Sequence, residues 1–183
     1  MRYRFLSHII SEEMSVYGGI GNLFVKPLRS IDSGDTSNVF RITMENHWGT
    51  HTDSPNHFFK EGKRISEYPA DFWIFRKPTV VDVDLKPAEI MKDITCLEAV
   101  RNDTDLLLFK SGWGKYRGQD VYGTQNPGIH PAVGHVVRRR FPNIKAVGID
   151  WISISSFRNR ELGRETHKVF LDPRGEGEPV LII

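Results

Sequence analysis

One short segment of the chain, NHWGTHTDSPNHFF, combines three histidines with an aspartate. His47, His51, Asp53 and His57 all occupy odd-numbered positions, so in an extended backbone their side chains would project to the same side. Imidazole and carboxylate groups are common protein ligands of zinc, and they also suit manganese or iron. The segment is therefore predicted to bind a divalent metal ion.

The backbone of this segment is predicted to be an extended loop rather than a helix. Gly49 allows a sharp turn between the first two histidines, and Pro55 disfavours a regular helix through the segment. Phe58 and Phe59 indicate partial burial, and a buried Asp53 would be costly without a cation or hydrogen bonds. These features favour a metal site over a merely polar surface loop.

A site of this kind leaves coordination positions open, which a structural zinc site does not. Water bound there could be deprotonated near neutral pH and attack a carbonyl group. One histidine need not bind the metal, and His57 is a candidate to carry protons because its ordinary pKa suits that work. Two histidines and one carboxylate also form the site of non-haem Fe(II) oxygenases, so hydrolase and oxygenase both remain open at this point.

Composition places the chain among folded proteins. It has 183 residues and a mass of 21.0 kDa, with 39% hydrophobic and 11% aromatic residues, which excludes an intrinsically disordered chain. We interpret residues 1–183 as one domain. The single cysteine, Cys96, excludes an intrachain disulfide framework and a multi-cysteine metal site.

Charge and hydropathy argue against two classes of partner. The formal net charge is only +2, and the densest basic cluster, at 138–140, is interpreted as the solvated face of a helix. We therefore expect no nucleic-acid partner. No run approaches the roughly 20 apolar residues of a membrane helix, and the first residues lack a secretory leader, so we expect a cytoplasmic protein with no membrane partner.

The coarse pattern predicts a mixed α/β fold in which strands outnumber helices. Two segments show helical spacing of apolar residues, namely 88–100, which follows Pro87, and 129–141. Short apolar runs closed by turn residues predict strands near the start of the chain (within 1–17) and at 39–47, 79–85, 105–112, 146–154 and 178–183.

The histidine-rich segment also resembles a known family. HWGTHTDSPNHF is similar to the HxGTHxDxPxHF signature of the cyclase family of metal-dependent hydrolases, which includes bacterial kynurenine formamidase and isatin hydrolase. Further segments resemble the family's motifs in the same order, so that the resemblance spans roughly residues 5–183. These segments are LLLFKSGW, NPGIHPAV, AVGIDWISI and THKVFL.

The resemblance implies a layered β/β/α fold with a mixed sheet and few helices, usually assembled as a homo-oligomer. It also implies hydrolysis of an amide-type C–N bond or an ester in a small-molecule substrate. By motif position, His47, His51 and Asp53 would hold the first metal ion, zinc or manganese. Asp53 would also bridge to a possible second ion, which His167 would join in binding.

Two further roles follow from the same resemblance. His57 would be the catalytic proton shuttle, and Tyr17 stands near the place of an aromatic group that contacts substrate in the family's formamidases.

The sequence departs from the family pattern at three places. The family's metal-binding glutamate follows the last apolar strand, whereas the sequence given ends at Ile183. This departure puts the second metal in doubt and leaves open a metal-binding module without catalysis. Asn126 and His130 replace the histidine and serine of another motif, and we expect them to alter substrate choice.

Overall fold

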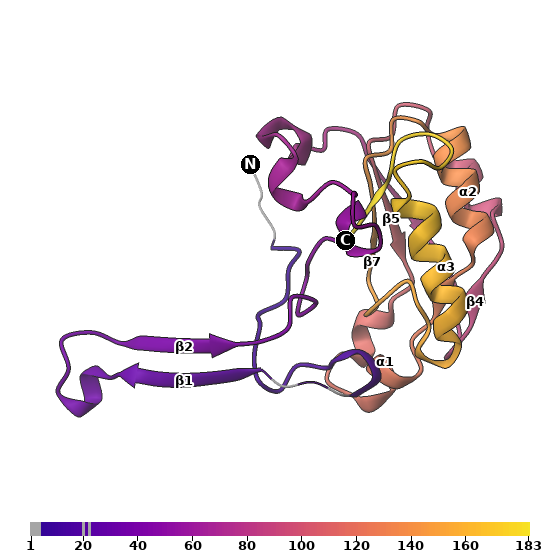
Figure 1. Cartoon of the computed structure of the whole chain (residues 1–183). Helices are drawn as coiled ribbons and strands as arrows, with labels where there is room; N and C mark the ends of the chain where they lie inside the picture. Colours follow the sequence, from indigo (N-terminus) through magenta and orange to yellow (C-terminus); the bar gives the residue numbers. More distant parts are fainter. Residues whose placement is uncertain (1–4, 20, 22) are drawn as a thin grey trace.

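The computed structural model describes residues 5–19, 21 and 23–183. Its centre is a four-stranded parallel sheet in the order β3-β5-β7-β8 (Figure 1). The edge strand β3 alternates exposed and buried residues, whereas most of β7 is buried, as expected for an inner parallel strand. These four strands confirm, in shorter form, four of the predicted ones; they are β3 Pro78–Asp82, β5 Leu106–Lys110, β7 Ala146–Ile149 and β8 Leu181–Ile182.

Two helices, α2 (Pro131–Arg140) and α3 (Arg160–Leu171), lie side by side against this sheet (Figure 1). The prediction of α2 is confirmed: Pro131 occupies its first turn, and Nδ1 of His130 accepts a hydrogen bond from Ala132 N at 3.1 Å. A third helix, α1 (Asp120–Thr124), is short. The α/β class with few helices is therefore confirmed.

The helix predicted over 88–100 is wrong. Ile90–Met91 instead forms β4, which pairs in parallel with β6 (Gly128–Ile129), and Thr95–Ala99 forms a 3-10 helix. The carboxylate of Asp93 accepts hydrogen bonds from the amide and the hydroxyl of Thr95 at 2.8 Å each. The amide of Thr95 therefore bonds to a side chain, and Ile90 and Met91 pair with a neighbouring strand. These backbone groups are no longer available for the hydrogen bonds of a helix.

A β-hairpin extends away from the rest of the chain (Figure 1). It consists of β1 (Phe24–Arg29) and β2 (Val39–Thr43), paired antiparallel, and β2 confirms the first part of the strand predicted at 39–47. We call residues 24–43 the arm. The strand predicted within 1–17 is not found in 5–17, and residues 1–4 lie outside the described part of the chain.

No helix in the described ranges is both long enough and apolar enough to cross a membrane; α3, with 12 residues, is far short of the roughly 20 required.

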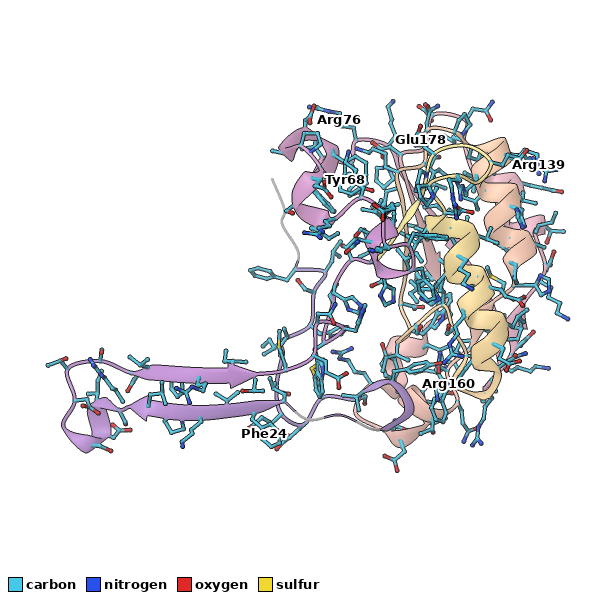
Figure 2. All side chains as sticks on the ribbon, in the orientation of Figure 1. Phe24, Tyr68, Arg76, Arg139, Arg160 and Glu178 are labelled. Atoms are coloured by element: carbon cyan, nitrogen blue, oxygen red, sulfur yellow. The ribbon has the colours of Figure 1, made fainter. Side chains whose placement is uncertain are left out.

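Arg138 corrects the interpretation of the basic cluster as a solvated face. Its guanidinium is buried and donates hydrogen bonds to the carbonyl oxygens of Val169 at 2.5 Å, Asp172 at 2.9 Å and Gly177 at 2.6 Å. Carbonyl oxygens in the last turn of a helix lack donors within the helix. Arg138 supplies donors to the carbonyls at the end of α3 and in the turn that follows, and so holds that turn in place. Arg139, by contrast, points outward on α2 (Figure 2).

We expect Arg138→Met to lower the free energy of unfolding by about 2–4 kcal/mol, because three backbone carbonyls would lose the charged donor that a buried guanidinium supplies. Arg139→Met is the matched control. Its 3.2 Å contact with Glu176 is at the surface, so the loss should stay below about 1 kcal/mol. Urea unfolding followed by circular dichroism measures both, and equal losses would contradict this role of Arg138.

Candidate metal centre

The loop that carries the predicted ligands is attached to the central sheet through Asp53. The amide of Asp53 donates to the carbonyl oxygen of Ile182 at 2.8 Å, and the amide of Ile182 donates to the carbonyl oxygen of Asp53 at 3.2 Å. This antiparallel bridge joins the loop to β8. It holds the largely buried carboxylate of Asp53 at one place beside the sheet.

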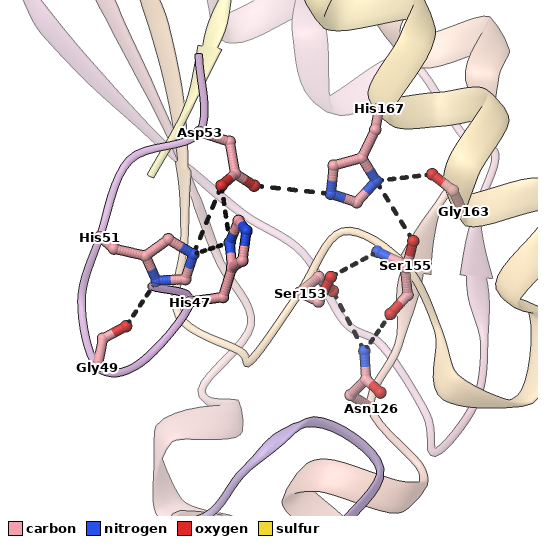
Figure 3. A network of polar contacts seen from close by, with 9 residues as sticks. All are labelled: His47, Gly49, His51, Asp53, Asn126, Ser153, Ser155, Gly163 and His167. Atoms are coloured by element: carbon pink, nitrogen blue, oxygen red, sulfur yellow. Dashed lines mark hydrogen bonds and ion pairs between the residues drawn. The ribbon is translucent and has the colours of Figure 1, made fainter. Parts of the chain in front are cut away.

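Three side-chain atoms from the loop converge at this place (Figure 3). Oδ1 of Asp53 lies 3.1 Å from Nδ1 of His47 and 3.6 Å from Nε2 of His51, and the two nitrogens are 3.1 Å apart. Two ligand atoms at about 2.1 Å from one tetrahedral ion would lie about 3.4 Å apart. The observed spacing is close to that value, so the three side chains could bind one ion together; their role as ligands stays a prediction.

Hydrogen bonding determines which nitrogen of His51 carries the proton. Nδ1 lies 2.9 Å from the carbonyl oxygen of Gly49, which can only accept, so Nδ1 carries a proton and Nε2 is the nitrogen that could bind a metal. The turn that permits this contact has Gly49 at φ 69°, a conformation that favours glycine. Nε2 lies 3.6 Å from Oδ1 of Asp53. Imidazole nitrogen and carboxylate oxygen are ligand types that zinc accepts, so these residues fit a metal ion.

His167, on α3, approaches Asp53 from the opposite side. Its Nδ1 lies 2.8 Å from the carbonyl oxygen of Gly163 and 3.3 Å from the hydroxyl of Ser155. Its Nε2 lies 3.8 Å from Oδ2 of Asp53, the oxygen that the other two histidines do not use. Asp53 thus has one oxygen directed toward the loop histidines and one toward His167 (Figure 3).

His57 lies beside these groups without joining the closest cluster. It ends the short 3-10 helix Pro55–His57, and its ring centroid is 4.3 Å from that of His47. Burial lowers the pKa of His57, and the charges of the other loop histidines lower it further, whereas Asp53 opposes the shift. A neutral imidazole able to accept a proton therefore stands next to the candidate metal position.

The electrostatics of the cluster favour an ionised Asp53. Burial alone would raise the pKa of this carboxyl, but the hydrogen bond with His47 and the charges of the nearby histidines hold it below its ordinary value. The same hydrogen bond raises the pKa of His47. Without a metal, a proton on His47 neutralises the carboxylate, and a metal ion would take over that function.

The cluster opens into a cavity of about 670 Å³. This volume lies within the range typical of small-molecule sites. The residues that line it are mostly of polar type and include His47, His51, Asp53, His57, Asn56, Arg64 and Ser66.

Tyr17 is not among the residues that line this cavity. Its ring packs edge-on against Phe157 with centroids 5.5 Å apart. Burial raises the pKa of Tyr17, and the charges of Arg160 and Arg164 oppose the rise. Contact of Tyr17 with substrate stays a prediction.

The sequence analysis expected Asn126 and His130 to alter substrate choice, and the structure shows structural contacts for both. Asn126 is fully buried, and its amide donates to the carbonyl oxygens of Ser153 at 3.2 Å and Ser155 at 2.7 Å. It therefore shapes the loop that supports His167 rather than contacting substrate directly. His130 likewise caps α2, as described above. An effect of these two residues on substrate choice stays a prediction.

Comparison with known proteins identifies the family. Residues 5–156 match the family model described as "Putative cyclase", and the chain belongs to this family, as its motifs indicated. The chain is 28% identical over 183 residues to cyclase-like protein 2 of Oryza sativa subsp. japonica, which covers 91% of this chain. It is 29% identical over 125 residues to kynurenine formamidase of Geobacillus thermodenitrificans, which covers 68% of this chain.

The fold is shared with solved structures. Isatin hydrolase A from Labrenzia aggregata superposes with a TM-score of 0.76 at 20% identity, covering 97% of this chain and 78% of that protein. This likeness confirms the cyclase-like fold. The chain spans 62% of the length of the rice protein and 56% of the length of the Geobacillus enzyme.

We expect His51→Ala to reduce the affinity for Zn²⁺ or Mn²⁺ at least tenfold, because one of three converging donors is removed. Metal content after dialysis, measured by elemental analysis, and titration calorimetry test this. His135→Ala, an exposed position on α2, is the matched control and should bind metal like the wild type. Unchanged binding by the His51 variant would exclude this ligand assignment.

Proposed function

We propose that the chain is a metal-dependent hydrolase that cleaves an amide-type C–N bond, or an ester bond, of a small molecule. The observation that carries the proposal is the convergence of His47, His51 and Asp53 at the wall of an open cavity. Membership of the cyclase family supports the same reaction class. The names kynurenine formamidase and isatin hydrolase among its relatives point toward formamides and cyclic amides as substrates to test.

The converging donor atoms of His47, His51 and Asp53 would hold the metal ion. When bound there, a metal ion would lower the pKa of a water molecule to near neutral and would act as a Lewis acid toward a carbonyl oxygen. Two imidazoles and a carboxylate suit zinc or manganese. Asp53 and His167 would be the ligands of a second ion.

His57 would act as general base and then as general acid. Its neutral ring, beside the metal ligands and at the cavity wall, would take a proton from the attacking water and deliver it to the leaving nitrogen or oxygen. Asn56, Arg64 and Ser66 would supply polar contacts for the substrate from the same wall.

Two other functions were compatible with the residues alone. A non-haem Fe(II) oxygenase uses the same ligand types, but the named relatives are hydrolases and do not favour it. A metal-binding module without catalysis is disfavoured by the cavity and by His57, which such a module would not need.

The decisive test replaces His57 by alanine. The variant should retain the metal, because His57 lies outside the closest cluster, while kcat falls about 10²- to 10⁴-fold through loss of the proton carrier. Hydrolysis of N-formylanilines, cyclic amides and aryl esters is measured with the Zn²⁺- and Mn²⁺-loaded wild type and variant.

The wild type stripped of metal by a chelator should lose activity and regain it when Zn²⁺ or Mn²⁺ is restored. If the metal-loaded wild type hydrolyses none of these substrates, the hydrolase proposal fails. If His57→Ala turns over like the wild type, the hydrolase stands and the role of His57 is refuted.

A further inference from the structure

One of the residues that line the cavity of the metal centre is Arg64, an exposed cation. Across residues 5–19, 21 and 23–183, the Arg64 guanidinium takes part in no ion pair, side-chain hydrogen bond or cation–π contact. Three other exposed cations, Lys77, Arg101 and Arg139, each pair with a carboxylate at 3.3 Å or less. The charge of Arg64, by contrast, is not neutralised within the described part of the chain.

The segment that carries Arg64 is held against the loop of the metal ligands. The amide of Asn56 donates to the carbonyl oxygen of Lys63 at 3.2 Å. Gly62 packs so closely on Pro55 that a Cβ at this position would overlap the carbonyl group of the proline. Arg64 therefore keeps its place at the cavity wall through backbone contacts, whether or not a ligand is bound.

The turn at Arg64 also explains why a nearby acid does not neutralise it. The amide of Arg64 donates to Oε2 of Glu67 at 2.7 Å, and the amide of Glu67 donates to the carbonyl oxygen of Arg64 at 3.0 Å. These two bonds begin the short 3-10 helix Ile65–Glu67. The carboxylate of Glu67 thus binds the backbone of Arg64 and leaves its guanidinium without a partner.

The charge of the cavity is positive once the centre holds a metal ion. Among the described residues that line the cavity, Asp53 is the one acid, and it is a predicted metal ligand. A divalent ion would outweigh the single negative charge of Asp53, and Arg64 adds a further positive charge. A cavity dominated by one sign of charge attracts ligands of the opposite sign. This balance favours an anionic substrate over a neutral or cationic one.

We propose that the substrate carries a carboxylate group and that Arg64 binds this group at the cavity wall. The inference rests on the hydrolase function proposed above and adds a substrate class, small amides or esters that bear a carboxylate. A guanidinium presents its donors in a planar fork, which matches the two oxygens of a carboxylate. A phosphate monoester carries a charge of about −1.5 to −2, which one guanidinium would only partly neutralise.

Ile65 adds an apolar contact beside this charge. It follows Arg64 in the chain, lines the same cavity and is 41% exposed. An aliphatic side chain next to a guanidinium suits a ligand whose carboxylate is attached to an apolar body. An aromatic ring that bears both a carboxylate and an amide group meets these requirements, and its dimensions fit a cavity of about 670 Å³.

Titration calorimetry with two ketones, which a hydrolase cannot cleave, tests the binding of the carboxylate. The metal-loaded wild type should bind 4-acetylbenzoate about tenfold or more tightly than 4-methylacetophenone, which lacks the charge. Arg64→Met should abolish most of this preference, because methionine keeps an apolar stem without the guanidinium. Lys63→Met is the matched control, since it removes the same charge one residue earlier. Lys63 Nζ lies 4.4 Å from the ring centroid of Tyr68, and Lys63 is not among the described residues that line the cavity.

The contradicting outcomes of this titration do not depend on catalysis. Equal affinity of the wild type for the two ketones would overturn the proposal. An Arg64→Met variant that keeps the full preference would also overturn it, because the metal ion alone would then hold the carboxylate. Equal losses in Arg64→Met and Lys63→Met would show an effect of overall charge and not a contact with Arg64. Metal content and circular dichroism check that both variants are folded and loaded.

Hydrolysis of N-formyl-4-aminobenzoate and formanilide tests the substrate class. The wild type should favour the carboxylate compound about tenfold or more in kcat/KM, mainly through a lower KM. Arg64→Met should lose this preference, whereas Lys63→Met should retain it. A wild type that prefers formanilide would refute the substrate class. If the wild type hydrolyses neither compound, the hydrolase proposal fails, while calorimetry still decides whether Arg64 binds a carboxylate.

Discussion

The metal centre depends on the backbone pairing between Asp53 and Ile182. This pair of hydrogen bonds ties an irregular loop to the end of β8, and β8 is itself held by pairing with β7. The carboxylate of Asp53 is thereby fixed relative to both the sheet and α3. The loop histidines can then meet it from one side and His167 from the other, although they lie more than 100 residues apart in sequence. A rigid central ligand converts two separate segments into one site.

Close packing of α3 against the 153–156 loop positions His167, the histidine on the other side of Asp53. Gly163 faces Ser155 so closely that a Cβ at this position would overlap the serine hydroxyl. The absence of a side chain lets the helix approach the 153–156 loop. The carbonyl of Gly163 then orients the ring of His167 toward Asp53. Gly163 and Asn126 both contribute to this packing. Asn126 holds the loop in place, and Gly163 lets the helix pack closely against it.

The local part of this arrangement could be predicted from the sequence, and the non-local part could not. Residue types and the turn at Gly49 were sufficient to place His47, His51 and Asp53 together, because all three lie within seven residues. Helix α3 gave no apolar signal, since its buried stripe begins with a glycine, a threonine and a histidine. The apolar spacing of 88–100 was misleading because β4 pairs with a strand almost 40 residues away. Arg138 lies in a charged cluster typical of a solvent-exposed helix face, yet its partners are carbonyls at the end of α3 and in the turn that follows.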